Sequence, residues 1–152
     1  MIRAHWTALC TLLALLAGLP AHAADPAGMV KVAKGQVSIE RDGKKLPATV
    51  GSQIEVADRV HTGSDGSVGV TLRDNTLLSA GPNSLIVIDK FAFDNATQDG
   101  NMSIRIRKGT LSVASGKIAK RTPESVDRHT PTSVLGVRGT EFVIEVEGGR
   151  DE

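Results

Sequence analysis

Residues 130–144 read TPTSVLGVRGTEFVI and combine apolar density with two glycines and a single arginine. Pro131 disfavours a helix at this point and biases the residue before it toward an extended conformation. Gly136 and Gly139 indicate places where the backbone turns or approaches another segment closely, and Arg138 stands between them. We therefore expect extended chain here, as the closing part of a sheet.

The segments before residue 130 alternate apolar and polar residues with the period of two that is typical of strands. The clearest example is residues 102–106, and we expect Gly109 to end that strand. Residues 85–88 are apolar on both faces, which predicts a strand buried from two sides. No apolar pattern after residue 23 keeps a period of 3.6 for three turns. The sequence therefore predicts an all-β fold, either a two-layered sheet or an irregular solenoid-like β roll of short strands.

Turn residues separate these predicted strands. The dipeptide Asp42-Gly43 predicts a hairpin, and residues 81–84, GPNS, predict a tight connection in which the asparagine adopts the left-handed region. Residues 91–100 are rich in Asp, Asn and Gln, and we expect them to form the longest surface loop. The polar residues 120–128 are expected to be an exposed connector into the segment at 130–144.

The N-terminus has the features of a secretory signal peptide. Arg3 precedes an apolar run over residues 6–19, and the small-residue triplet Ala21-His22-Ala23 follows. The run is too short for a confident membrane span, so we expect cleavage after Ala23 and no membrane span in the mature chain. An uncleaved membrane anchor is the alternative.

The predicted organisation is a cleaved signal peptide at 1–23, a short lead at 24–28, a β domain at 29–147 and a polar tail at 148–152. Removing Arg3 with the signal leaves 17 basic and 17 acidic residues, and this balance gives no reason to expect binding to nucleic acid or to an anionic membrane. The only cysteine, Cys10, lies in the signal peptide, so the mature chain has no disulfide and no cysteine zinc site.

The mature chain shows no constellation of catalytic or metal-binding residues. His61 and His129 have no cysteine, histidine or paired carboxylate at ligand spacing, and no Gly-x-Ser-x-Gly motif is present. The three phenylalanines are its only aromatic residues, which disfavours stacking platforms for sugars or bases. The GVRG motif at 136–139 lacks the lysine and hydroxyl residue of a phosphate-binding loop. We therefore expect a protein that is not an enzyme and uses no metal or cofactor.

The segment at 130–144 resembles the closing signature of the FecR domain, which runs roughly T-P-x-x-x-x-G-V-R-G-T-x-F. The resemblance continues upstream through residues 35–37, 62–66 and 81–84, and it covers most of residues 29–146. The positions that match the signature are Thr130, Pro131, Gly136, Val137, Arg138, Gly139, Thr140 and Phe142.

This resemblance implies a periplasmic domain, because FecR domains belong to bacterial regulators of sigma factors. Full-length regulators of this type have a cytoplasmic anti-sigma segment, a membrane helix, the β domain and a C-terminal subdomain that meets an outer-membrane transducer. The present chain resembles the β domain alone. We therefore expect a stand-alone exported version, a non-enzymatic interaction module of the periplasm or cell surface with an unidentified protein partner. The alternative is a component of FecR-type transmembrane signalling, acting in sigma-factor regulation with a partner protein.

Two roles are expected for the residues of this region. The signature residues are structural or partner-binding, and the guanidinium fork of Arg138 is expected to satisfy several loop carbonyls at once. Val143, Glu145 and Glu147 alternate with apolar residues in the last strand, which related domains follow with a further strand pair. We expect that strand to lack a neighbour and to accept a strand from a second copy or from another protein. The glutamates on this strand are interpreted as a solvated face rather than as catalytic carboxylates.

Overall fold

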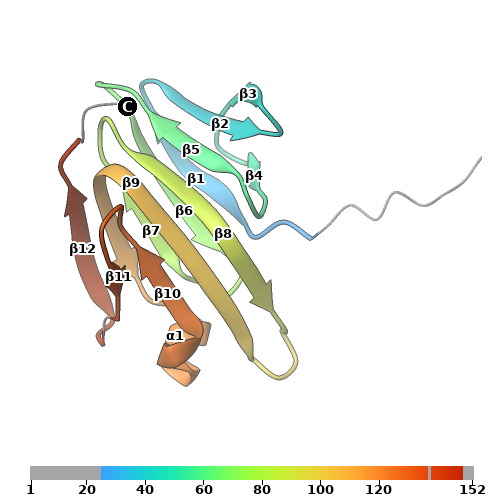
Figure 1. Ribbon diagram of the computed structural model, residues 1–152. Helices are drawn as coiled ribbons and strands as arrows, with labels where there is room; N and C mark the ends of the chain where they lie inside the picture. Colours follow the sequence, from blue (N-terminus) through green and yellow to red (C-terminus); the bar gives the residue numbers. More distant parts are fainter. Residues whose placement is uncertain (1–24, 137, 149–152) are drawn as a thin grey trace, which may run out of the picture.

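Strands make up nearly all of the regular structure in the computed structural model, which describes residues 25–136 and 138–148 (Figure 1). The predicted all-β fold is confirmed. The predicted signal peptide and most of the predicted tail lie outside the described residues. The first strand starts at Gly28, and Ala27 just before it is buried.

The elements of the described residues follow one another in this order: β1 (Gly28–Lys34), β2 (Val37–Arg41), β3 (Lys44–Pro47), β4 (Gln53–Ile54), β5 (Arg59–Thr62), β6 (Ser67–Leu72), β7 (Leu77–Ala80), β8 (Leu85–Phe93), β9 (Gly100–Ala114), α1 (Lys117–Arg121), the 3-10 turn η1 (Pro123–Ser125), β10 (Val126–His129), β11 (Val134–Leu135) and β12 (Glu141–Val146).

The strands form one curled sheet that folds into two layers, and β9 belongs to both. The first layer has the order β3-β2-β5-β8-β9, and β10 and β11 extend it beyond the N-terminal half of β9. The second layer has the order β9-β7-β6-β1-β4, and β12 pairs with the C-terminal half of β9. Figure 1 shows β9 crossing the molecule beside β8, with β12 at the margin. Among the described strands, all pairings are antiparallel except that of β10 with β9. The structure is thus the two-layered form of the fold.

The hydrophobic core lies between the two layers. Val60, Ile86 and Ile88 contribute from the first layer, and Val70 and Leu78 contribute from the second. The predicted period of two is visible in the alternating buried positions of β6 and β7. Each fully buried aliphatic side chain contributes about 1.5–3 kcal/mol, so this face provides the main stabilisation of the sheet.

Several turn predictions are confirmed by backbone angles. Asp42 and Gly43 both have positive φ, 52° and 74°, and they join β2 to β3 with Arg41 opposite Lys44. Asn83 has a φ of 54° in the predicted GPNS connection. The strand predicted to be buried from both sides is also confirmed, since Ile86, Val87 and Ile88 are all at most 8% exposed.

Gly109 does not end its strand, contrary to the prediction. β9 continues through it for 15 residues, and Gly109 has a φ of 88°. A side chain at this position would collide with Ser84, whose hydroxyl accepts a hydrogen bond from the N–H of Thr110 at 3.0 Å. Residues before Gly109 pair with β8, and residues from Gly109 onward pair with β12. The glycine therefore marks the point where one strand passes from the first layer to the second.

The loop predicted at 91–100 is shorter than expected. Strand β8 extends to Phe93, and both Phe91 and Phe93 are buried, so only residues 94–99 form the connection. The N–H groups of Thr97 and Ala96 donate to Asp94 Oδ1 and lower the pKa of that carboxyl. The Asp, Asn and Gln residues lie from residue 94 onward, whereas Phe91 and Phe93 alternate about Ala92 and continue the pattern of the strand.

The prediction of an exposed connector at 120–128 is wrong. This segment contains the end of α1, η1 and most of β10, and Val126 and Arg128 are buried. The buried Asp74 positions α1, because its carbonyl oxygen accepts from the N–H of Lys117 at 2.8 Å and its Oδ2 accepts from the N–H of Ile118 at 3.3 Å. A helix of five residues is unstable alone, so this long-range contact is what orders it.

We expect Gly109→Ala to destabilise the protein by roughly 1–3 kcal/mol, because the new Cβ adds backbone strain and collides with Ser84. Chemical denaturation will measure the change. Gly43→Ala is the matched control, since Gly43 also has positive φ but a Cβ there meets no atom within 4 Å. Equal losses in the two variants would show that the contact with Ser84 is unimportant.

Candidate functional site

The beginning of the signature is a turn between β10 and β11. The N–H of Thr130 donates to the carbonyl oxygen of Ser133 at 2.8 Å, and the N–H of Ser133 donates to Thr130 Oγ1 at 3.1 Å. Pro131 is exposed at the second position of this turn, where its fixed φ suits the backbone. Thr130 thus contributes both a backbone and a side-chain hydrogen bond to this turn.

The two signature glycines, Gly136 and Gly139, differ in whether their backbone conformation favours glycine. Gly139 has a φ of 146°, in the region that favours glycine, whereas a Cβ at Gly136 would meet no atom within 4 Å and its φ is not positive. The chain around Gly139 is fixed to the end of β9 by the buried Ser115. Its hydroxyl donates to the carbonyl oxygen of Gly139 at 3.2 Å, and its N–H donates to that of Thr140 at 2.7 Å. Val137 lies outside the described residues.

Phe142 packs against an arginine that the sequence analysis did not select. The guanidinium carbon of Arg128 lies 4.5 Å from the centre of the Phe142 ring, and Arg128 is only 4% exposed. Burial lowers the pKa of Arg128, but an arginine still carries its charge at neutral pH. This cation–π contact joins β10 of the first layer to β12 of the second.

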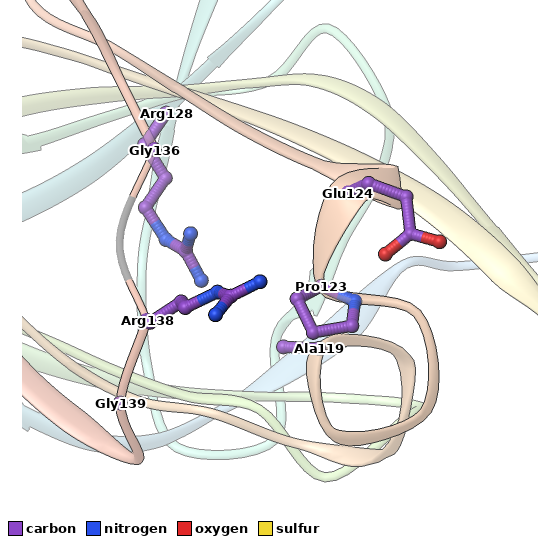
Figure 2. Close-up of a pocket in the computed structure, with 7 residues that line it drawn as sticks. All are labelled: Ala119, Pro123, Glu124, Arg128, Gly136, Arg138 and Gly139. Carbon is purple, nitrogen blue, oxygen red and sulfur yellow. The ribbon is translucent and has the colours of Figure 1, made fainter.

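Arg138 is the signature residue whose guanidinium the sequence predicts to bind loop carbonyls. Its side chain is exposed, and within residues 25–136 and 138–148 no carbonyl accepts a hydrogen bond from its guanidinium. The guanidinium is directed instead into a hollow of about 630 Å³ between the signature and the α1–η1 segment. Figure 2 shows the side chains of Arg128 and Arg138 entering this hollow from one side, with Pro123 and Glu124 on the other.

The last strand has a neighbour, contrary to the prediction. β12 pairs with β9 over its whole length, from Glu141 opposite Ala114 to Val146 opposite Gly109. Ile144 is buried, and Phe142 and Val146 pack against the core, while Val143 is 66% exposed. The predicted half-buried alternation is therefore confirmed. The difference from the prediction is that β9 covers one edge of β12.

The outer edge of β12 pairs with no strand among the described residues. The N–H of Ser115 donates to the carbonyl oxygen of Thr140, which makes these residues a hydrogen-bonded pair. Such pairs alternate along an antiparallel ladder, so Phe142, Ile144 and Val146 also direct their backbone groups toward β9. Glu141, Val143 and Glu145 therefore direct theirs outward. Glu147 is exposed just beyond the strand.

The remaining polar residues are the possible ligands for a metal ion. Within the part of the chain that the structure describes, no group of three or more His, Cys, Asp or Glu side chains could hold a metal ion. His61 Nε2 lies 3.3 Å from a carboxylate oxygen of Glu40. Among these same residues, no helix has the length and apolar character needed to cross a membrane.

Comparison with known protein families matches residues 58–152 to the family described as FecR protein. The chain belongs to the FecR family. The match includes every signature position and both strands of the hairpin at 126–135. Comparison with curated proteins gave no match, and comparison with solved structures also gave none.

Sequence reasoning missed two residues of this region, Arg128 and Ser115. Both are polar residues, Arg128 lies in the segment predicted to be exposed, and the burial of Arg128 depends on a strand that is distant in sequence. A usable signal did exist, because Val126 and Arg128 alternate with the polar Asp127 and His129 in the way of a short strand. Arginines are rarely buried, so this alternation alone gives little reason to expect a buried arginine.

We expect a double-mutant cycle between Arg128→Met and Phe142→Leu to give a coupling energy of about 0.5–2 kcal/mol, the range of a cation–π contact. Denaturation of the wild type, both single variants and the double variant will measure it. A coupling near zero would mean that the ring and the guanidinium contribute independently.

Proposed function

We propose that this FecR-family chain is an exported, non-enzymatic interaction module of the periplasm or cell surface that binds a protein partner along the outer edge of β12. Membership of the FecR family supports a module related to signalling regulators. It also supports export, because the domain is periplasmic in those regulators. The observation that carries the binding mode is the outward row of backbone groups at Glu141, Val143 and Glu145. An edge of this kind can add a strand from another chain.

The side chains on this edge favour a basic partner strand. Glu141 and Glu145 are exposed on the strand, and Glu147 continues the row. Opposite charges in facing positions of a sheet stabilise the pairing by roughly 0.2–1 kcal/mol each, so lysines or arginines on the added strand would complement them. The exposed Val143 between them offers an apolar contact to the middle of that strand.

The same charges disfavour pairing between two copies. In the antiparallel register centred on Val143, which uses all the outward groups of β12, Glu141 of one copy would face Glu145 of the other. Like charges directly opposite each other destabilise a sheet. We therefore propose a heterologous partner rather than the homo-oligomer that strand addition would also permit.

The second candidate is a component of FecR-type transmembrane signalling that takes part in sigma-factor regulation. The family match favours it, since regulators of this type give the family its name. Genes for a sigma factor and an outer-membrane transducer beside the gene for this chain would support it. A neighbourhood without them would leave the interaction module as the better proposal.

We expect amide exchange in β12 to alternate along the strand in the monomer. The amides of Phe142, Ile144 and Val146 should be protected by β9, and those of Glu141, Val143 and Glu145 should exchange fast. A short synthetic peptide with alternating lysine and valine should protect the fast set, and a peptide with glutamate in place of lysine should not. NMR-detected exchange with each peptide will test this. Uniform protection of β12 in the monomer would contradict the open edge.

We expect Val143→Pro to abolish binding of the lysine–valine peptide while leaving the domain folded. Proline removes the backbone N–H, and at residue 143 that donor faces away from β9, so the ladder with β9 keeps its hydrogen bonds. Val143→Thr keeps the donor and is the matched control. Unchanged peptide binding by Val143→Pro would place the interaction elsewhere.

We expect export with cleavage after Ala23. Intact-mass measurement of the periplasmic fraction from a bacterial expression host should give a chain that begins at Ala24. Recovery of a chain that retains Met1 in the membrane fraction would instead support the uncleaved anchor.

A further inference from the structure

We propose that the hollow containing Arg128 and Arg138 is a binding site for a monocarboxylate, with the carboxylate held between the two guanidinium groups and an apolar body resting on Ala119 and Pro123. The hollow lies between the signature segment and the α1–η1 segment (Figure 2). It is a separate feature from the outer edge of β12, so the site goes beyond the strand addition proposed above and does not depend on it.

Arg128 is a buried cation without an anionic partner among the described residues. No carboxylate there lies within 4.0 Å of its guanidinium, and its one close charge contact is the face of the Phe142 ring. Arg41 is the internal comparison, because its guanidinium donates to both carboxylate oxygens of the buried Asp58, at 2.8 and 2.7 Å. A buried charge is costly unless it is paired, so an anion bound beside Arg128 would offset this cost.

Arg138 adds a second guanidinium to the same hollow. The conformation of Gly139 and the hydrogen bonds of Ser115 fix the chain that carries it. Two cations directed into one space repel each other, and an anion between them turns this repulsion into attraction. Guanidinium groups suit a carboxylate because their planar forks can donate two parallel hydrogen bonds.

The charge and size of the hollow define the class of ligand. Among the described residues, two arginines and Glu124 line it, so this part of the lining carries the charge of one cation, which matches a monoanion better than a phosphate dianion. A volume of about 630 Å³ falls within the range of small-molecule sites, roughly 300–1,000 Å³, and exceeds what a lone carboxylate fills. Ala119 and Pro123 offer an apolar wall for the rest of the ligand. The carboxylate can belong to a free organic acid or to the C-terminus of a peptide, and both present the same chemistry.

The first experiment titrates the protein with sodium benzoate and follows the side-chain Nε–H signals of its arginines by NMR. We expect saturable shifts at Arg128 and Arg138. Arg138→Gln should weaken binding by about tenfold or more, because it removes a charge-assisted hydrogen bond. Arg138 is exposed, so this variant should remain folded. Arg107→Gln, at an exposed arginine of β9 outside the hollow, is the matched control and should bind like the wild type.

A second variant tests the charge balance. Glu124→Gln should strengthen benzoate binding severalfold, because it removes the negative charge from the wall of the hollow. It should also bring inorganic phosphate, which we expect to bind the wild type more weakly than benzoate does, closer to benzoate in affinity. Unchanged benzoate affinity in both Glu124→Gln and Arg138→Gln would overturn the site.

Two further arms identify the source of the carboxylate. A short peptide ending in a free leucine carboxylate is compared with the same peptide amidated at its C-terminus. Loss of binding on amidation supports the carboxylate site. Tighter binding of the peptide than of benzoate indicates that the natural ligand is a chain end, and the reverse order indicates a free acid. Equal binding of the amidated peptide, tighter binding of phosphate than of benzoate, or no saturable shift with any probe would overturn the proposal. Val143→Pro should bind benzoate normally, which separates this test from that of the β12 edge.

Discussion

The passage of β9 through both layers is the constraint on which the rest of the structure depends. Its N-terminal half pairs with β8 and β10, and its C-terminal half pairs with β7 and β12, so elements from the middle and the end of the chain meet on one strand. The passage needs a residue without a side chain at position 109, because Ser84 occupies that space. Ser84 in turn bonds Thr110 and Thr62, which ties the bend to the first layer.

The candidate sites are consequences of this arrangement. Because β9 holds β10 on one half and β12 on the other, the connection between them must cross from one layer to the next. The signature segment makes that crossing, with Ser115 holding it at the end of β9 and Phe142 covering Arg128. The hollow forms where the crossing segment passes α1 and η1. The open edge of β12 forms because β12 is the last strand of its layer among the described residues.

The differences between prediction and structure have a common physical origin. The sequence predicts a strand end at Gly109 and an exposed connector at 120–128, and in both cases the local pattern is not sufficient to decide the structure. A glycine within a strand can mark a close approach as well as a break, and only the position of Ser84 shows which applies. The segment at 120–128 is polar, yet Asp74 orders its helix and β9 buries Val126 and Arg128.

The amino-acid sequence by itself determined the all-β fold, the turns at Asp42-Gly43 and Asn83, the half-buried pattern of β12 and the family. These features depend on the alternation of neighbouring side chains and on local backbone preferences, and a short run of consecutive residues sets both. The tertiary structure alone decided that β9 covers the inner edge of β12, that Arg128 is buried against Phe142, and that Arg138 faces a hollow rather than loop carbonyls. A period of two shows which face of a strand is buried but carries no information on which strand lies beside it, because backbone hydrogen bonds are the same for every residue.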